Sequence, residues 1–328
     1  MKFLSVTTAL ALTLSASALF ANDKPGEGVT VRPVVQPILE EYFQARIIDR
    51  ALKDLGYTVA EPQEVIAQTA HLAVGTGDAD YFTNSWDQLH DAFFKEAGGP
   101  DAISKVGTLV EGALQGYLVD KASYDAGVKN LGDFKDPEVA KKFDADGDGK
   151  ADLAGCVPGW GCERVIEHHL TEYGLRDTVN HNQGEYNAII ADTIARVANK
   201  EPVLYFTWTP YWVSGALVPG KDVEWLDVPH TSLPDGGTGN TEFNGKNLGF
   251  AVDNLRIIAR NDFLKANPAA AKLFEVAKVD INDISAENKQ IADGEKNSAD
   301  IDRHVEAWVA ANQATYDGWL AAAREAAK

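Results

Sequence analysis

Short apolar runs alternate with amphipathic segments along most of the chain. Runs rich in Val, Ile, Tyr and Phe predict buried strands, and segments with apolar residues every three to four positions predict helices. We expect strands at residues 29–35, 57–59, 80–83, 108–118, 203–208, 223–228 and 250–259. We expect helices at residues 37–55, 85–98, 163–173 and 183–199 and in several pieces from 262 to 328. This alternation indicates an α/β fold with helices on both faces of parallel sheets.

The length of the chain, 328 residues, predicts two lobes. One hydrophobic core rarely serves more than about 250–300 residues, so each lobe should hold about 150 residues. A ligand cleft is then expected between the lobes, outside the carboxyl ends of the strands.

Residues 1–21 have the pattern of a secretory signal peptide. They carry one charged residue, Lys2, followed by an uncharged run of Leu, Ala, Ser and Thr. Cleavage is expected after Ala21, with Ala18 as the alternative. No later segment reaches the roughly 18 consecutive apolar residues of a membrane-spanning helix. We therefore expect an exported, soluble protein located in the periplasm.

The formal net charge is −19, and it becomes −20 when Lys2 is removed (−19 − 1 = −20). Such an acidic chain argues against nucleic acid and anionic membranes as partners.

A glycine-rich loop with both cysteines of the chain, Cys156-Val-Pro-Gly-Trp-Gly-Cys162, leads directly into a predicted helix. Two cysteines in an exported protein indicate a disulfide, and two buried free thiols are the alternative. The helix start offers unpaired N–H groups and the positive pole of the dipole, which favour an anion. With Trp160 at the loop tip, the pattern suits a small zwitterion that has a bulky cation at one end and a carboxylate at the other.

Three tryptophans, Trp86, Trp160 and Trp208, lie at expected strand ends or loop tips. A tryptophan at such a place commonly fills a core, but the glycines on both sides of Trp160 argue against that role there. His90 follows Trp86 by four residues and shares its face if a helix begins at Ser85. It is either a ligand-binding residue or a structural histidine with its hydrogen bonds satisfied.

An acidic loop matches part of a calcium-binding pattern. Asp144, Asp146, Asp148 and Asp152 stand at loop positions 1, 3, 5 and 9. Position 12, where a bidentate glutamate belongs, is Gly155. Calcium is therefore a possible cofactor of this loop, and a solvated acidic turn is the alternative.

Several segments together resemble the periplasmic glycine betaine/proline betaine-binding proteins of osmoprotectant ABC importers. They include the cysteine loop and Trp208-Thr-Pro-Tyr-Trp212, and they lie at residues 84–91, 112–118, 144–153, 156–162, 181–184 and 205–213. The resemblance implies a two-lobed, type II-like substrate-binding fold with two crossovers. It also implies a receptor with no enzymatic activity and no required cofactor. The expected partners are a betaine and the membrane permease and ATPase subunits of an importer, and the receptor is expected to be a monomer.

The resemblance further implies a box formed by Trp86, Trp160 and Trp208 around a trimethylammonium group. His90 and the backbone N–H groups of Gly161 and Cys162 would hold the carboxylate, and Cys156 and Cys162 would form the disulfide. We place the crossovers near Gly112–Gln115 and Leu248–Val252. Residues 22–114 and 250–328 then form one lobe, and residues 115–249 form the other.

Three alternatives to a betaine receptor stay open at this point. The first is a receptor for choline, carnitine or another quaternary amine. The second is an exported enzyme acting on such a compound with His90 as base, although no common catalytic or nucleotide-binding motif is present. The third is a structural protein that depends on calcium.

Overall fold

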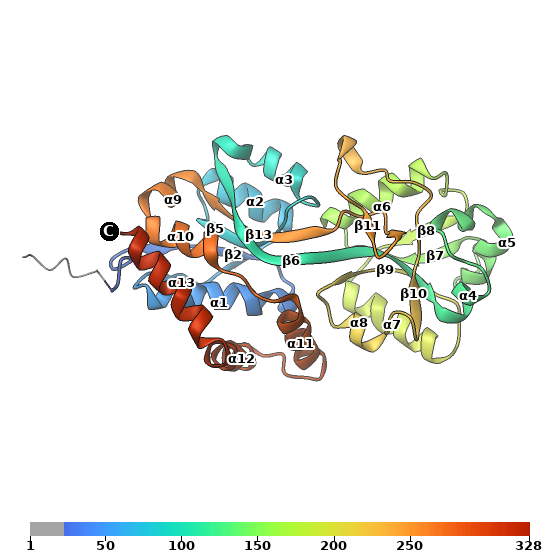
Figure 1. Cartoon of the computed structure of the whole chain (residues 1–328). Helices are drawn as coiled ribbons and strands as arrows, with labels where there is room; N and C mark the ends of the chain where they lie inside the picture. The colour runs from blue at the N-terminus through green and yellow to red at the C-terminus, as the bar shows by residue number, and fades with distance from the viewer. Residues whose placement is uncertain (1–22) are drawn as a thin grey trace, which may run out of the picture.

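The protein consists of two bodies of helices and strands, and one long strand, β6 (Ile103–Asp120), runs through both of them (Figure 1). The structure is a computed structural model and describes residues 23–328. The predicted signal peptide, residues 1–21, lies outside the described residues. Within residues 23–328, none of the helices is both long enough and apolar enough to cross a bilayer.

Nine strands form one continuous mixed sheet in the order β4-β2-β5-β13-β6-β9-β7-β8, with β10 also beside β6. Two further pairs, β1 with β3 and β11 with β12, lie outside it. The strands other than β6 are β1 (Thr30–Val31), β2 (Pro33–Val35), β3 (Thr58–Val59), β4 (Gln63–Glu64), β5 (Tyr81–Trp86), β7 (Ala151–Ala154), β8 (Val179–Asn182), β9 (Leu204–Thr209), β10 (Val223–Trp225), β11 (Glu242–Phe243), β12 (Lys246–Asn247) and β13 (Asp253–Arg260).

The α-helices lie between the strands and in the C-terminal part of the chain. They are α1 (Tyr42–Asp54), α2 (Ala67–Thr76), α3 (Asp91–Glu96), α4 (Lys121–Asp125), α5 (Pro137–Ala140), α6 (Gly161–Glu172), α7 (Tyr186–Ala198), α8 (Val213–Ala216), α9 (Asn261–Ala266), α10 (Pro268–Val276), α11 (Ile281–Ala292), α12 (Ser298–Ala311) and α13 (Gln313–Ala326). Short 3₁₀ turns add η1 (Leu39–Glu41), η2 (Gly99–Asp101), η3 (Leu131–Lys135), η4 (Lys141–Phe143) and η5 (Pro234–Gly236).

Strand β6 changes its pairing partner halfway along its length. Residues 103–113 pair antiparallel with β13, whereas residues 114–119 pair antiparallel with β9. Gly112, next to this change, has a φ of +75°, which a glycine adopts without strain. Its N–H donates to the Asn254 side chain at 3.2 Å, which ties β6 to the start of β13.

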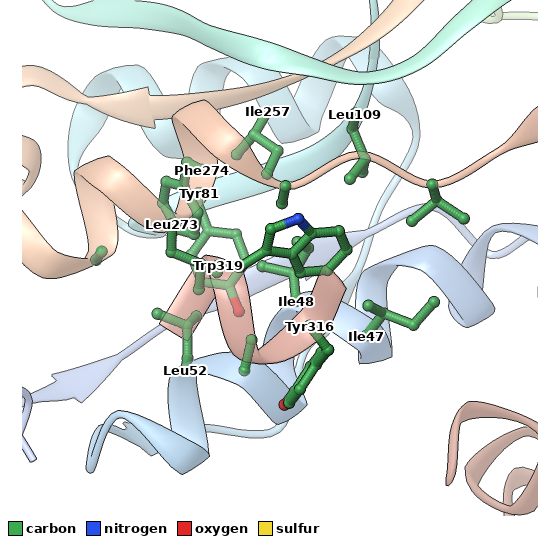
Figure 2. Packing of buried hydrophobic residues seen from close by; sticks show 14 of the residues in the cluster. Ile47, Ile48, Leu52, Tyr81, Leu109, Ile257, Leu273, Phe274, Tyr316 and Trp319 are labelled. Carbon is green, nitrogen blue, oxygen red and sulfur yellow. The ribbon is translucent and has the colours of Figure 1, made fainter. Parts of the chain in front are cut away.

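Separate hydrophobic cores fill the two bodies. The first draws on residues 31–113 and 255–323, and the second on residues 117–250. In the first core, side chains from α1, α10 and α13 pack under one face of the sheet, and Figure 2 shows Trp319 at the centre of this packing. A smaller apolar cluster, which includes Ala70 and Val74 of α2, covers the other face.

Three further tryptophans lie in or against the hydrophobic cores. Trp308 and Trp319 are 9% and 5% exposed, and Trp225 packs partly buried against the second core. All three tryptophans therefore serve packing.

Two predictions about local structure are wrong. The sheet is mixed, because β13 and β6 run antiparallel to their neighbours, while the β2–β5 and β7–β9 pairs are parallel. The expected helix from Ser85 is also absent: β5 continues through Ser85 to Trp86, and α3 starts only at Asp91. Every residue of β5 is buried, and the Ser85 hydroxyl bonds His71 at 3.0 Å instead of capping a helix. Burial in the sheet therefore outweighs the local capping signal.

Candidate functional site

Three tryptophans from separate parts of the chain meet at one cavity between the two cores. Trp86 ends β5, Trp208 lies in β9, and Trp160 directly precedes α6. The rings of Trp160 and Trp208 lie 5.7 Å apart between centroids and nearly perpendicular, at 78°. The cavity is lined by Gln36, Ile38, Glu41, Trp86, Leu89, His90, Gln115, Trp160, Gly161, Cys162, Phe206 and Trp208. The structure thus brings all six residues of the predicted ligand site to the same cavity.

The position of Trp160 depends on a constrained loop. Cys156 and Cys162 form a disulfide, with Cα atoms 5.9 Å apart. The Cys156 N–H donates to His181 at 2.9 Å, and His181 bonds Glu167 of α6 at 2.7 Å. The loop is therefore anchored at its start to β8 and α6, and Trp160 is held at the start of that helix.

Gly161 lies in close contact with Leu89 and His90 of the other body. A Cβ atom on Gly161 would lie 2.7 Å from the Leu89 Cγ and 3.0 Å from the His90 ring, so only glycine fits without a shift. Gly161 and Cys162 are the first two residues of α6, whose initial N–H groups have no acceptor within the helix. These two donors lie at the cavity beside His90.

His90 is a buried, neutral histidine with a defined proton position. Its Nδ1 accepts the backbone N–H of Trp86 at 3.2 Å, so the ring proton of the neutral form resides on Nε2. Burial holds the pKa of His90 well below its usual value, and the nearby His71 and Lys105 lower it further. The ring therefore offers one N–H donor without carrying a charge.

The turn between Trp86 and His90 is fixed by Asp253, the first residue of β13. Its carboxylate accepts the N–H groups of Gln88 and Leu89, each at 3.0 Å. Burial raises the pKa of Asp253 to about 6, and these hydrogen bonds oppose that rise. His90 thus reaches Trp86 through a turn, not through the helical face expected from the sequence.

Six lining residues were missed by sequence reasoning: Gln36, Ile38, Glu41, Leu89, Gln115 and Phe206. Gln36, Ile38 and Glu41 follow the carboxyl end of β2, which lies beside β5. The predicted helix from residue 37 concealed this position. The only signal in the sequence is the adjacent acidic pair Glu40 and Glu41, a few residues after the predicted strand at 29–35.

A second and more polar cavity of about 400 Å³ adjoins the first and shares Leu89, Gln115 and Gly161 with it. Its charged lining residues include Arg164 and Asp235, which form an ion pair at 2.6 Å. The three tryptophans do not line this cavity. The smaller aromatic cavity is therefore the one that matches the predicted cation box.

The acidic loop brings three of its four aspartates together. Carboxylate oxygens of Asp144, Asp146 and Asp152 lie within 4.8 Å of one another, whereas Asp148 bonds Asn180 at 2.6 Å. Both oxygens of Asp144 accept backbone N–H groups of the loop. Three carboxylates without a bidentate ligand at Gly155 are fewer than the six to eight oxygens that calcium takes. Calcium binding by this loop stays a hypothesis.

Two α/β bodies with separate cores, one shared strand and an aromatic cavity between them define a two-lobed solute-binding protein. The sequence matches the family described as the substrate-binding domain of the ABC-type glycine betaine transport system over residues 29–311. The chain belongs to this family, and the resemblance stated from the sequence is confirmed.

Similar proteins support the same assignment. The chain is 50% identical to the glycine betaine-binding periplasmic protein OusX of Dickeya dadantii over 325 residues, covering 98% of each chain. It is 47% identical to the glycine betaine/proline betaine-binding periplasmic protein of Escherichia coli over 318 residues, covering 96% of each.

Solved structures confirm the predicted fold class. The lactococcal OpuAC protein in its closed, glycine betaine-bound conformation aligns with a TM-score of 0.67 at 20% identity, covering 89% of this chain and 99% of that one. A glycine betaine/L-proline-binding protein of Borrelia burgdorferi aligns with a TM-score of 0.70 at 15% identity, covering 91% and 100%. At these identities the alignments establish the two-lobed fold alone.

Proposed function

We propose that the protein is a periplasmic receptor that captures glycine betaine or proline betaine and delivers it to the permease and ATPase subunits of an ABC importer, for osmoprotection. The observation that carries this proposal is the cavity itself, in which three tryptophans lie beside a neutral histidine and the start of α6. Membership of the glycine betaine transport family and the names of the periplasmic relatives support it.

The tryptophans Trp86, Trp160 and Trp208 would surround the trimethylammonium group. A quaternary ammonium cannot donate a hydrogen bond, so its attraction comes from aromatic faces that lose little hydration of their own. Each desolvated ring contributes up to about 2 kcal/mol, before the cost of ordering is subtracted.

The other end of the cavity would hold the carboxylate. The His90 Nε2–H and the N–H groups of Gly161 and Cys162 would donate to it, and the dipole of α6 would add a partial positive charge. Because His90 is neutral, these donors recognise the carboxylate by hydrogen bonds, and choline, which lacks one, leaves them unpaired.

Ligand would bridge two lobes made of residues 22–114 with 250–328 and of residues 115–249. Trp86 and His90 belong to the first, and Trp160 and Trp208 to the second. Closure about the segments Gly112–Gln115 and Leu248–Val252 then buries the solute, and the closed form docks on the importer.

We also propose that the protein binds its solute as a monomer, without chemical turnover and without a cofactor. Binding by aromatic faces and N–H donors requires no metal. Removal of divalent cations with a chelator should therefore leave both the fold and the betaine affinity unchanged.

Calorimetric titration with glycine betaine, choline and proline tests the proposal. We expect tight binding of glycine betaine and weaker binding of choline. Trp160→Ala should weaken glycine betaine binding by up to about thirtyfold, because the loss of one ring at 2 kcal/mol corresponds to that factor.

Trp225→Phe is the matched control, because Trp225 packs against the second core away from the cavity. It should bind like the wild type. Equal affinity for choline and glycine betaine would contradict the carboxylate pocket, and no binding of either would contradict the function.

A further inference from the structure

Glu41 is an acidic residue in the wall of the tryptophan cavity. It is the last residue of η1, which follows β2, and it lines the cavity together with Trp86, Trp160 and Trp208. Its backbone C=O accepts a hydrogen bond from the Nδ2 of the buried Asn84 at 3.2 Å. The Asn84 Oδ1 in turn accepts a hydrogen bond from the Gln44 Nε2 of α1 at 3.0 Å. The backbone that carries Glu41 is therefore held firmly to β5 and α1.

The carboxyl of Glu41 is oriented by one neighbour, Gln36. Both Glu41 oxygens lie 3.0 Å from the Gln36 Nε2, which donates to them. The Gln36 amide cannot turn over freely, because its Oε1 accepts the Ala67 N–H at 3.2 Å. Gln36 is buried, and it also lines the cavity.

No lysine, arginine or histidine nitrogen among residues 23–328 pairs with this carboxyl within 4.0 Å. An ionised carboxylate in a partly desolvated site needs a counter-charge. The cavity that Glu41 faces has three aromatic walls suited to a cation. We propose that Glu41 is a fourth wall of the cation site, and that the positive end of the bound solute supplies the counter-charge of its ionised carboxylate. This inference rests on the proposed function.

When no solute is bound, a proton neutralises the Glu41 carboxylate instead. Burial, with a smaller contribution from Glu40, raises the pKa of Glu41 to about 8 against the opposing effect of the Gln36 hydrogen bonds. A bound cation favours the ionised form, so binding should release a proton near neutral pH.

The other titratable groups around Glu41 do not explain such a release. Glu40 and Tyr42 flank it in the chain, and burial raises the pKa of both, but neither residue lines the tryptophan cavity. His90 lies at the same cavity and is neutral, since its pKa is lowered. Tyr211 follows β9, and its pKa is raised by burial above the range of interest. From α11, the uncharged residues Ile284 and Asn288 face this segment.

This arrangement also separates a bulky cation from sodium or potassium. A protonated carboxyl does not attract small hydrated cations, whereas a permanently ionised one attracts them without selectivity. The aromatic walls must first admit a cation with weak hydration before ionisation of Glu41 is favoured.

The test is titration of the full mature protein with glycine betaine at pH 6, 7 and 8, in phosphate and in Tris. The heats in buffers with different ionisation enthalpies give the number of protons released. We expect about half to one proton per betaine at pH 7, and an affinity about tenfold or more weaker at pH 6 than at pH 8. Glu41→Gln should release no proton and should bind at pH 8 with the weaker affinity of the wild type at pH 6.

Glu40→Gln is the matched control, because Glu40 lies on the same turn but does not line the tryptophan cavity. It should keep the proton release, as should Glu41→Asp. Binding by the wild type that is tight but independent of pH overturns the role of Glu41 and leaves the betaine receptor intact. Loss of proton release in Glu40→Gln also overturns it. Absence of betaine binding at every pH overturns the proposed function, and this inference with it.

Discussion

At the scale of single residues, the proton position on His90 determines what the ring can recognise. Its Nδ1 is occupied by the Trp86 N–H, so the only group left for a ligand is the Nε2–H donor. This uncharged N–H donor makes a stronger hydrogen bond to the carboxylate of a betaine than to the hydroxyl of choline. A hydrogen bond to the choline hydroxyl would gain little over the one that the hydroxyl makes with water.

His90→Ala should therefore act on betaines and spare choline. Removal of one hydrogen bond to a charged group costs about 1.5–3 kcal/mol, which lowers glycine betaine affinity by about ten- to hundredfold. Calorimetry with both ligands measures the difference. His90→Gln, which can place an N–H donor near the same point, should recover part of the loss.

The exposed His230, which bonds Glu172 at the surface, gives the matched control. His230→Ala should bind both ligands like the wild type. An equal loss of betaine and choline in His90→Ala would show that His90 merely supports the packing of the cavity.

Residues of the site were predictable where the local sequence restricts their role. Trp160 stands between two glycines in a cysteine loop, and this context has no explanation in core packing. Glu41 has no such context, because a glutamate near the start of a predicted helix is ordinary. Only the pairing of β2 beside β5 shows that Glu41 and Trp86 meet at one cavity.

At the scale of elements, the cysteine loop and α6 act as one unit. The disulfide joins the first residue of the loop to the second residue of the helix, so Trp160 and the first N–H groups keep their relative positions. A loop that is ordered before binding loses less conformational freedom on binding.

Replacement of both cysteines, Cys156→Ala with Cys162→Ala, should lower betaine affinity severalfold. The small closed loop predicts a loss of unfolding free energy at the low end of the usual range, about 2 kcal/mol. Titration calorimetry and denaturant unfolding measure the two effects separately. Unchanged affinity in a destabilised but folded variant would show that the bridge serves stability alone.

Helices and strands were predictable where the local pattern of apolar residues marks them. The order of strands in the sheet was not, because it depends on pairing between segments far apart in the chain. The helical pattern at residues 163–173 and the apolar run at 203–208 appear as α6 and β9 with ends shifted by a few residues. The insertion of β13 between β5 and β6 was not predictable, because it joins segments over 130 residues apart in the chain. That insertion makes the sheet mixed.

At the scale of the whole molecule, buried acids and buried histidines change the free energy of unfolding in opposite directions as the pH varies between 4 and 6. Burial lowers the pKa of His71 and His169 to about 4, so their contribution to stability is lost as the pH falls from 6.5 to 4. Burial raises the pKa of Asp49 and Asp253 to about 6, so their contribution falls as the pH rises toward 6. Between pH 4 and 6 the two effects largely cancel.

Above pH 6.5 these two histidines and two aspartates no longer change the free energy of unfolding, and groups with a higher pKa determine it. Glu41, with a pKa of about 8, still holds its proton in the native state, whereas the unfolded chain does not. His304 acts in the same direction, because Glu287 and Glu295 raise its pKa despite the opposing effect of burial. A group with a raised pKa loses its stabilising contribution as the pH rises through that value.

The free energy of unfolding of the ligand-free protein should therefore fall by about 2 kcal/mol from pH 6.5 to pH 8. Urea unfolding at fixed ionic strength measures it. Saturating glycine betaine should reduce the fall, and Glu41→Gln should reduce it without ligand. A stability that rises over this interval would contradict the protonation assigned to Glu41.

The strand that crosses from one core to the other also limits how such receptors can be recombined. Since β6 contributes to the sheets of both bodies, each body separated from the other would lose a strand or expose an unpaired edge. The two halves are therefore not exchangeable modules, even though their cores are distinct. A change of solute in this architecture must come from substitutions at the cavity wall, and not from the transplantation of a lobe.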